Sequence, residues 1–274
     1  MNEILKKIHD IGIVPVIALD DPDYAVPLAN ALAAGGLNAC EITFRTDAAE
    51  ETIRIITKEV PDMLVGAGTV LTCDQADRAI KAGARFIVSP GFNPKVTRHV
   101  LSKDVCMVPG CETPGEMEQA MELGLDTVKF FPAQQNGGVT KLRVLAGPYR
   151  NLKWMPTGGV NTTNLAEYMS FEKVLACGGT WMVKKDLIEN ERWDEITAIC
   201  KDAVMKMLGI SILPLDTGND TICVSVFDLD RAVYHLSRMG ASFDEKSRTE
   251  DEKGGSSIYL TDRLGNLSVQ LVRR

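Results

Sequence analysis

The sequence predicts an α/β protein, a (β/α)₈ TIM barrel followed by a small C-terminal α+β appendage. Three observations lead to this prediction. From Ile11 to Gly209, short apolar runs alternate with amphipathic stretches of helical periodicity. The apolar runs are nearly continuous, which is typical of parallel strands buried on both faces. Eight such strand–helix units close most economically into a barrel.

Each predicted strand is a run of β-branched, aromatic and small apolar residues that ends near Gly, Pro, Thr or Ser. In chain order the strands are Ile13–Ala18, Ala39–Phe44, Met63–Thr69, Phe86–Pro90, Val105–Pro109, Thr127–Phe131, Lys153–Thr157 and Val174–Cys177. A helical stretch follows each strand, for example Tyr24–Ala34, Ala48–Glu59 and Pro114–Leu123. A doubly wound open sheet is the alternative, but it usually carries a G-x-G-x-x-G motif after the first strand, and none occurs there.

The pattern changes after the predicted helix Trp193–Leu208. We expect the barrel to occupy residues 1–209, a linker rich in turn-forming residues to occupy 210–220, and a small βαβββ module to occupy 221–274. Within the module the sequence predicts a first strand, a helix, a polar loop and two further strands, at Thr221–Phe227, Leu229–Met239, Glu245–Gly255, Ser256–Leu260 and Leu267–Val272. A module of this size is marginally stable alone.

Composition excludes several classes of protein. The net charge is −7 and no basic run offsets it, which argues against a nucleic-acid binder. The chain begins with an amphipathic helix at Met1, and no segment approaches the roughly 20 apolar residues of a membrane span. The seven cysteines are scattered without a C-x-x-C pair, so we expect reduced thiols and a cytoplasmic protein.

Lys129 is the first candidate for covalent chemistry. It lies inside the apolar strand Thr127–Phe131, where burial disfavours a charged ammonium. A buried lysine either pairs with an acid or serves as an amine nucleophile. Glu41, in the apolar strand Ala39–Phe44, is the candidate partner, and both a structural ion pair and a general acid/base role fit it.

Other chemically useful residues follow the predicted strands, and in a barrel the carboxyl ends of the strands form the active face. Arg45, Thr69 and Pro90 follow the second, third and fourth strands. Gly158-Gly159 and Gly178-Gly179 follow the seventh and eighth, where barrels often bind phosphate through exposed backbone N–H groups. Asn161 suits the N-cap of the next helix. His9, His99 and His235 lie on predicted helices away from this face, and we expect them to be structural.

Residues 1–208 resemble the class I aldolases of the 2-keto-3-deoxy-6-phosphogluconate (KDPG) and 4-hydroxy-2-oxoglutarate (KHG) family. The resemblance rests on motifs in family order, which are Glu41-Ile42-Thr43-Phe44-Arg45-Thr46, Val65-Gly66-Ala67-Gly68-Thr69-Val70, Val88-Ser89-Pro90-Gly91-Phe92, Val128-Lys129-Phe130-Phe131-Pro132-Ala133, Leu145-Ala146-Gly147-Pro148, Pro156-Thr157-Gly158-Gly159-Val160 and Gly178-Gly179-Thr180-Trp181. The resemblance implies a barrel enzyme that needs no metal or other cofactor and assembles as a homotrimer. It also implies a phosphorylated keto acid as substrate.

The resemblance also implies roles for individual residues. Lys129 would form a Schiff base with the keto carbon, and Glu41 would be the general acid/base. Arg45 and Thr69 would hold the pyruvate carboxylate, with Pro90 and Phe131 shaping the pocket. Thr157 resembles the residue that favours the gluconate-type epimer, and the phosphate would be held by Gly158, Gly159, Gly179 and Thr180. The chain has Ala18 where some members carry arginine, and Thr180 where many carry serine.

The tail resembles one βαβββ half of a vicinal-oxygen-chelate (glyoxalase-like) module, on the basis of Asp262-Arg263-Leu264-Gly265-Asn266 and Val269-Gln270-Leu271. The glutamate and histidine that ligate metal in that family are missing, so we expect no metal there. Because one half normally pairs with another, the tail is expected to pair between subunits. Two alternative functions remain open from the sequence, another phosphosugar barrel enzyme and a non-catalytic sensor or scaffold for a phosphorylated keto acid.

Overall fold

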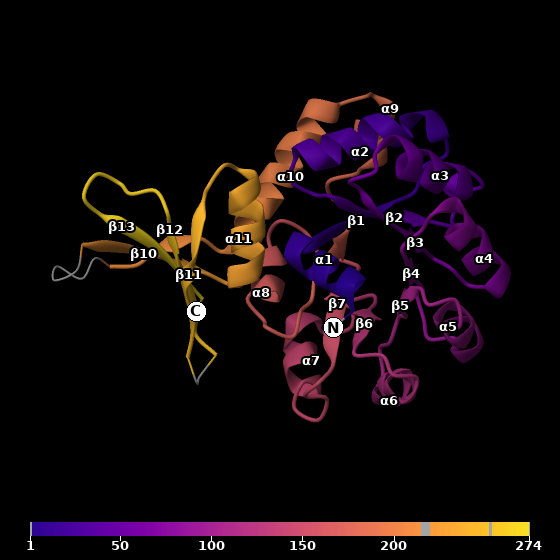
Figure 1. Ribbon diagram of the computed structural model, residues 1–274. Coiled ribbons are helices and arrows are strands. Elements are labelled where there is room, and N and C mark those ends of the chain that lie inside the picture. The colour runs from indigo at the N-terminus through magenta and orange to yellow at the C-terminus, as the bar shows by residue number, and fades with distance from the viewer. Residues whose placement is uncertain (1, 215–219, 252–253, 274) are drawn as a thin grey trace.

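Eight parallel strands alternate with helices in the first part of the chain and confirm the predicted barrel (Figure 1). The computed structural model describes residues 2–214, 220–251 and 254–273. The strands are β1 (Ile13–Ile17), β2 (Ala39–Thr43), β3 (Leu64–Gly68), β4 (Phe86–Val88), β5 (Cys106–Val108), β6 (Thr127–Phe130), β7 (Lys153–Pro156) and β8 (Cys177–Gly179).

All but the first of the barrel helices surround the strands, and the first lies across the barrel end formed by the amino ends of the strands (Figure 1). The helix ends follow local sequence signals. The helices are α1 (Glu3–Ile11), α2 (Ala25–Ala34), α3 (Ala49–Glu59), α4 (Cys73–Ala82), α5 (Pro94–Leu101), α6 (Pro114–Glu122), α7 (Gly138–Leu145), α8 (Leu165–Met169), α9 (Lys185–Glu189) and α10 (Trp193–Leu208), with a short 3₁₀ helix η1 (Pro22–Tyr24). The Asn93 side chain caps α5 and Pro94 opens it. Gly83 ends α4 in the left-handed conformation.

The strands close on themselves in a ring. One sheet has the order β5-β4-β3-β2-β1-β8, and β6 pairs with β7. Parallel bridges complete the ring, between Gly110 and Lys129 on one side and between Thr157 and Gly178 on the other. All carboxyl ends of the strands therefore lie at one end of the barrel.

The eighth strand lies later in the chain than predicted. The prediction was Val174–Cys177, but β8 is Cys177–Gly179 and pairs with Ile13–Pro15 of β1. Val174 instead forms an isolated bridge with Trp154. The apolar run correctly predicted that this segment is buried, since Val174 through Gly179 are all buried. Its hydropathy does not indicate that pairing with β1 begins only at Cys177.

The C-terminal segment forms a mixed sheet with one helix, in the order β11-β12-β13-β10-β9. Its elements are β9 (Ser211–Ile212), β10 (Thr221–Val226), α11 (Leu229–Arg238), β11 (Phe243–Glu250), β12 (Ser256–Leu260) and β13 (Ser268–Arg273). From β10 onward the order of elements is the predicted βαβββ.

Two details of this segment differ from the prediction. Residues 245–250, expected in a polar loop, belong to the edge strand β11, whose side chains are largely exposed and lack a hydropathic alternation. Residues 252–253 of that loop lie outside the described residues. In the predicted linker 210–220, Ser211 and Ile212 already pair with β10, and residues 215–219 lie outside the described residues. The domain division at 209 and 221 stays a prediction.

The module contacts the barrel end opposite the carboxyl ends of the strands, where α11 packs beside α1 (Figure 1). Arg231 of α11 is buried and donates to the carbonyl oxygens of His9 (2.9 Å) and Leu175 (2.9 Å). His235 Nε2 contacts the carbonyl oxygen of Ile11 at 3.0 Å. Two side chains of the module therefore pair with carbonyls in the last turn of α1, which a helix end leaves without intrahelical partners.

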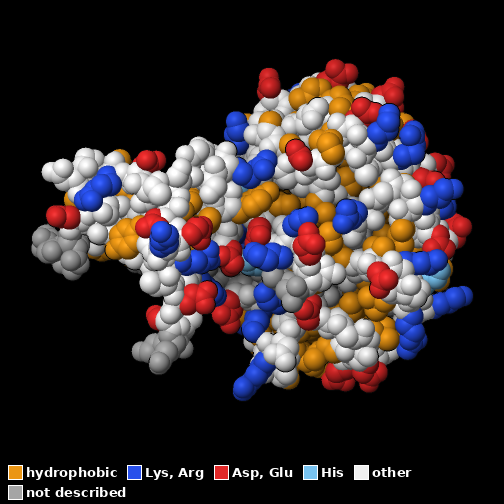
Figure 2. Space-filling view, viewed as in Figure 1, with side chains coloured by type: hydrophobic (Ala, Val, Ile, Leu, Met, Phe, Trp, Pro, Cys, Tyr) orange, Lys and Arg blue, Asp and Glu red, His pale blue; other side chains and the backbone are white. Residues whose placement is uncertain are grey.

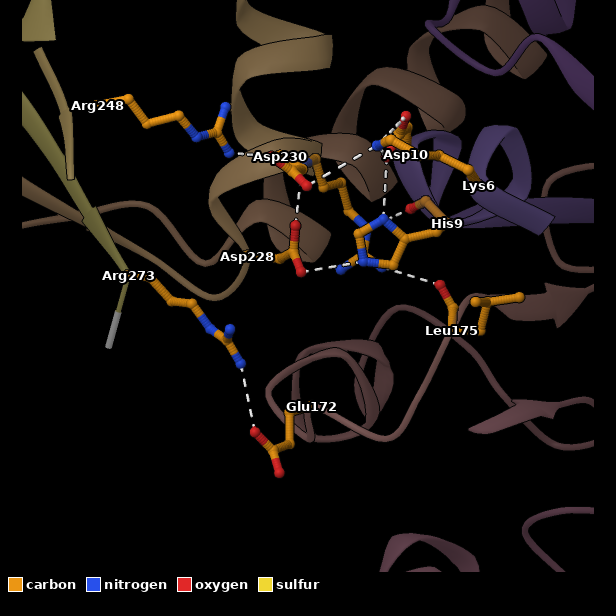
Figure 3. Close-up of polar contacts among 10 residues, drawn as sticks. Lys6, His9, Asp10, Glu172, Leu175, Asp228, Asp230, Arg248 and Arg273 are labelled. Atoms are coloured by element: carbon orange, nitrogen blue, oxygen red, sulfur yellow. Dashed lines mark hydrogen bonds and ion pairs between the residues drawn. The ribbon is translucent and has the colours of Figure 1, made fainter. Parts of the chain in front are cut away.

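Charged groups surround this contact (Figure 3). His9 lies between Asp10 (3.0 Å) and Asp228 (3.1 Å). Burial alone would lower the pKa of His9, but its hydrogen bonds to the two carboxylates outweigh burial and raise that pKa. Burial would conversely raise the pKa of Asp228, but the hydrogen bond to His9 and the charge of Arg231 hold it well below its usual range. Arg273 reaches Glu172 of the barrel at 3.4 Å.

The surface shown in Figure 2 intersperses Lys and Arg with Asp and Glu, and no broad basic patch gathers on that face. No helix in the described part of the chain has the length and apolar character needed to cross a membrane.

Candidate active site

A cavity of about 340 Å³ opens at the carboxyl ends of the barrel strands. The structure brings together there every residue that the sequence predicted for substrate binding, along with Lys129. The predicted residues that line it are Arg45, Thr69, Pro90, Phe131, Thr157, Gly158, Gly159, Gly179 and Thr180. These residues come from the ends of six different strands, so the barrel topology alone gathers them.

Lys129 and Glu41 form a buried ion pair beside this cavity. The Nζ of Lys129 lies 3.2 Å from Oε1 of Glu41. Lys129 is 4% exposed and Glu41 is 0% exposed. The second carboxylate oxygen of Glu41, Oε2, is buried and has no hydrogen-bond partner among the described residues. One oxygen therefore holds the amine, and the other is available to exchange a proton.

Glu41 fits inside the barrel because its neighbour on β3 is a glycine. Thr43 pairs with Gly68 in the parallel ladder, and Glu41 pairs with Gly66. A Cβ at Gly68 would overlap the Glu41 carboxylate, so the side chain occupies space that any other residue at position 68 would fill. On the far side, Lys129 pairs with Met155 of β7 and forms the bridge to Gly110.

A cation and a hydroxyl lie on one side of the cavity. The Nε of Arg45 lies 3.4 Å from Oγ1 of Thr69. Thr69 has a φ of 55°, a left-handed conformation that is uncommon for a β-branched residue. The Phe131 ring packs near the amine, with Lys129 Nζ 5.3 Å from its centroid. This arrangement can hold a small carboxylate between Arg45 and Thr69 with its neighbouring carbon close to Lys129.

Backbone turns form the other side. Gly158 and Gly159 have φ values of 94° and 76°. At Gly179 the constraint is packing, because a Cβ there would overlap the ring of Trp181. Thr157 Oγ1 is buried and has no hydrogen-bond partner among the described residues. Glycine turns of this kind expose backbone N–H groups, which suit an anion such as phosphate.

Other reactive side chains lie apart from this chemistry. Burial raises the pKa values of five thiols to about 12, so these groups stay protonated and are poor nucleophiles; they belong to Cys40, Cys106, Cys111, Cys177 and Cys200. His9 and His235 lie at the module contact, and His99 pairs with Asp77 at 2.9 Å. The described residues contain no cluster of three or more His, Cys, Asp or Glu side chains arranged for a metal.

Sequence reasoning missed two lining residues, Val16 and Val160. Val16 is paired in register with Glu41, and Val160 follows the Gly-Gly turn, so both positions could have been found from the predicted ladder and motif. Asn161 makes the hydrogen bonds expected of an N-cap, one turn before α8. Its Oδ1 accepts from the Thr163 N–H at 2.8 Å, and its carbonyl oxygen accepts from the Leu165 N–H at 3.0 Å. Asn164, which directly precedes α8, makes no side-chain capping hydrogen bond there.

Known proteins resemble this chain over most of the barrel. A family model described as "KDPG and KHG aldolase" matches residues 3–199. A 2-dehydro-3-deoxy-phosphogluconate aldolase of Haemophilus influenzae is 44% identical over 203 residues, covering 74% of this chain and 96% of its own. The KHG/KDPG aldolase of Escherichia coli K12 is 41% identical over 192 residues, covering 70% of this chain and 90% of its own.

Among solved structures, the KDPG aldolase of Legionella pneumophila has a TM-score of 0.71 and 34% identity, covering 73% of this chain and 97% of its own. That protein was captured with pyruvate as a covalent carbinolamine intermediate.

Proposed function

Because this chain belongs to the KDPG and KHG aldolase family, we propose that it cleaves 2-keto-3-deoxy-6-phosphogluconate to pyruvate and glyceraldehyde 3-phosphate through a lysine imine. The observation that carries this proposal is the Lys129–Glu41 pair, 3.2 Å apart and buried beside a cavity with anion-binding groups on both sides.

The reaction follows from the positions of these groups. The Lys129 amine adds to the C2 ketone of the substrate, and water leaves to give a protonated imine. The imine withdraws electrons as the C3–C4 bond breaks, while Glu41 accepts the proton of the C4 hydroxyl through a water. Glyceraldehyde 3-phosphate departs, the remaining enamine takes a proton at C3 from Glu41 through water, and addition of water to the imine releases pyruvate and the free amine.

The two ends of the cavity divide the binding of the substrate. Arg45 and Thr69 hold the carboxylate, and Pro90 and Phe131 shape the space around the keto carbon. Gly158, Gly159, Gly179 and Thr180 receive the phosphate end, and Thr157 lines the cavity beside them. Cleavage of 4-hydroxy-2-oxoglutarate to pyruvate and glyoxylate is a second candidate activity, since a solved relative with 31% identity and a TM-score of 0.69 is named for both substrates.

The deciding experiment traps the imine. Wild-type protein, pyruvate and borohydride are expected to give one covalent adduct by intact mass, and Lys129→Ala is expected to give none. Lys95→Ala, which removes an exposed lysine, is the matched control and should react like wild type. Glu41→Gln should still form the adduct but cleave substrate about 100-fold to 10,000-fold more slowly. An adduct that persists in Lys129→Ala would refute the assignment.

For the assembly we propose a cytoplasmic homotrimer whose C-terminal modules pair between subunits. All seven cysteines are free, as expected for a reducing compartment. The module exposes Ile212 and Leu264, which a paired module could cover. A monomeric mass by sedimentation equilibrium would contradict the trimer, and a scattering envelope with isolated modules would contradict their pairing. Fractionation of cells would test the compartment.

A further inference from the structure

The Thr157–Gly159 turn is held from its outer side by the loop that follows β6. The carbonyl oxygen of Thr157 accepts from the Ala133 N–H at 2.8 Å, and that of Gly158 accepts from the Gln134 N–H at 3.0 Å. Two successive carbonyls of the turn are therefore fixed in direction by a neighbouring backbone.

Side chains fix the third carbonyl. The Gly159 oxygen accepts from Nδ2 of Asn164 at 3.0 Å and from Nδ2 of Asn161 at 3.2 Å. Asn164 Oδ1 in turn accepts from the Asn161 N–H at 2.8 Å. Asn164 thus holds the turn through its amide nitrogen and holds the following residue through its amide oxygen.

A second layer orients Asn164. Oε1 of Gln134 accepts from Asn164 Nδ2 at 3.3 Å and from the Tyr168 hydroxyl at 3.0 Å. Both hydrogens of the Asn164 amide are then engaged, which leaves it one orientation. Tyr168 is 1% exposed, and burial raises its pKa to about 12, so its hydroxyl remains a donor at neutral pH. A Cβ at Gly138 would lie 3.2 Å from that hydroxyl oxygen, so a glycine leaves room for the cluster.

Peptide geometry relates the fixed carbonyl groups to the direction of the N–H groups in the same turn. In a trans peptide the N–H points opposite to the C=O of the same unit. With the carbonyls of Gly158 and Gly159 fixed outward, the N–H groups of Gly159 and Val160 point to the other side of the turn. Neither N–H donates to another described residue, and both residues line the cavity.

We propose that Asn164, supported by Gln134 and Tyr168, is a positioning residue that presets the Gly158–Gly159 turn to bind the substrate phosphate. The inference rests on the proposed aldolase function for its substrate, but the network is a feature of this chain's own residues. Without Asn164 the turn keeps its glycines and loses the preorganisation of its donors, which raises the cost of ordering them on binding.

The test separates phosphate binding from imine chemistry. Asn164→Ala and Asn164→Asp are compared with wild type in three measurements. These are steady-state cleavage of 2-keto-3-deoxy-6-phosphogluconate, the rate of pyruvate trapping by borohydride, and calorimetric binding of 3-phosphoglycerate. Glu167→Gln, an exposed change on α8 whose side chain is not part of this network, is the matched control.

We expect Asn164→Ala to raise KM for the phosphorylated substrate and Kd for 3-phosphoglycerate about tenfold, as for loss of one or two hydrogen bonds. Its kcat and its pyruvate trapping rate should stay within about threefold of wild type. Asn164→Asp should bind phosphate more weakly still, because a carboxylate replaces the donor. Tyr168→Phe should show a smaller change in the same direction and serves if the Asn164 variants fold poorly.

Equal phosphate affinity in wild type and the variants would overturn the inference. So would an equal loss of pyruvate trapping and phosphate binding, which would indicate a general structural role. Failure of wild type to trap pyruvate would instead refute the proposed function. The calorimetric comparison would still test whether Asn164 supports phosphate binding at the Gly158–Gly159 turn.

Discussion

At the residue scale, the proposed catalytic pair depends on a position that carries no chemistry of its own. Glu41 is fully buried, and its carboxylate lies where a side chain at Gly68 would lie. The glycine is thus a condition for placing an acid 3.2 Å from the Lys129 amine. The sequence predicted both Lys129 and Glu41, because each is a charged residue inside an apolar strand.

Gly68→Ala is expected to lower kcat about 100-fold, because the added methyl displaces the Glu41 carboxylate from Lys129 by a large fraction of an ångström. Cleavage kinetics measure this, and pyruvate trapping should be slowed as well. Gly91→Ala is the matched control, since its Cβ meets no atom within 4 Å, and it should keep activity within about twofold. Full activity in Gly68→Ala would contradict this prediction, because it would show that β3 can shift to accommodate the methyl group without displacing Glu41.

At the element scale, Arg231 joins three segments that are distant in sequence. From α11 it reaches the carbonyls of His9 at the end of α1 and Leu175 just before β8. Because α1 leads into β1, and β1 pairs with β8, this one side chain links the two segments that precede these paired strands. A cation also suits the C-terminal end of a helix dipole.

Arg231→Leu is expected to reduce the free energy of unfolding by about 3 kcal/mol, because it leaves buried carbonyls without donors and removes one of the two cationic groups beside Asp228. Urea denaturation measures the change. Arg248→Leu, which breaks a more exposed ion pair to Asp230 on the same helix, is the control and should cost less than about 1 kcal/mol. Similar losses in the two variants would argue against a linking role for Arg231.

At the scale of the whole molecule, the contact between module and barrel holds two histidines whose pKa values are shifted in opposite directions. The pKa of His9 is raised in the folded protein, so its contribution to stability is present at low pH and is lost as pH rises through that pKa. Burial, together with the nearby charges of Arg231 and Arg238, lowers the pKa of His235 to about 4. Its contribution is present above pH 6.5 and is lost as pH falls toward 4.

Acidification from pH 7 to pH 5 should therefore remove about 2 kcal/mol of stability through His235. His235→Asn is expected to flatten the fall in the free energy of unfolding over this range, and His9→Asn is expected to steepen it. Urea denaturation at fixed pH values measures both slopes. Parallel slopes for wild type and both variants would contradict the assignment of these groups.

Much of the barrel and its site follows from local sequence. Continuous apolar runs predicted the positions of seven strands closely. The residues that follow these strands predicted the lining of the cavity, because parallel strands bring their carboxyl ends to one side. The strand β8 was misplaced, since two of its three residues are glycines and its apolar neighbours precede it. The edge strand β11 was missed because both of its faces are largely polar and exposed.

The sequence by itself determined the catalytic candidates, because a lysine and a glutamate inside apolar strands are costly unless they meet. Only the tertiary structure decided how the turn at Gly159 is held by Asn164 and where the C-terminal module docks. Those contacts depend on which backbone carbonyls remain without partners after folding. Arg231 is an ordinary helical arginine in the sequence, and its burial follows from carbonyls that belong to residues 9 and 175.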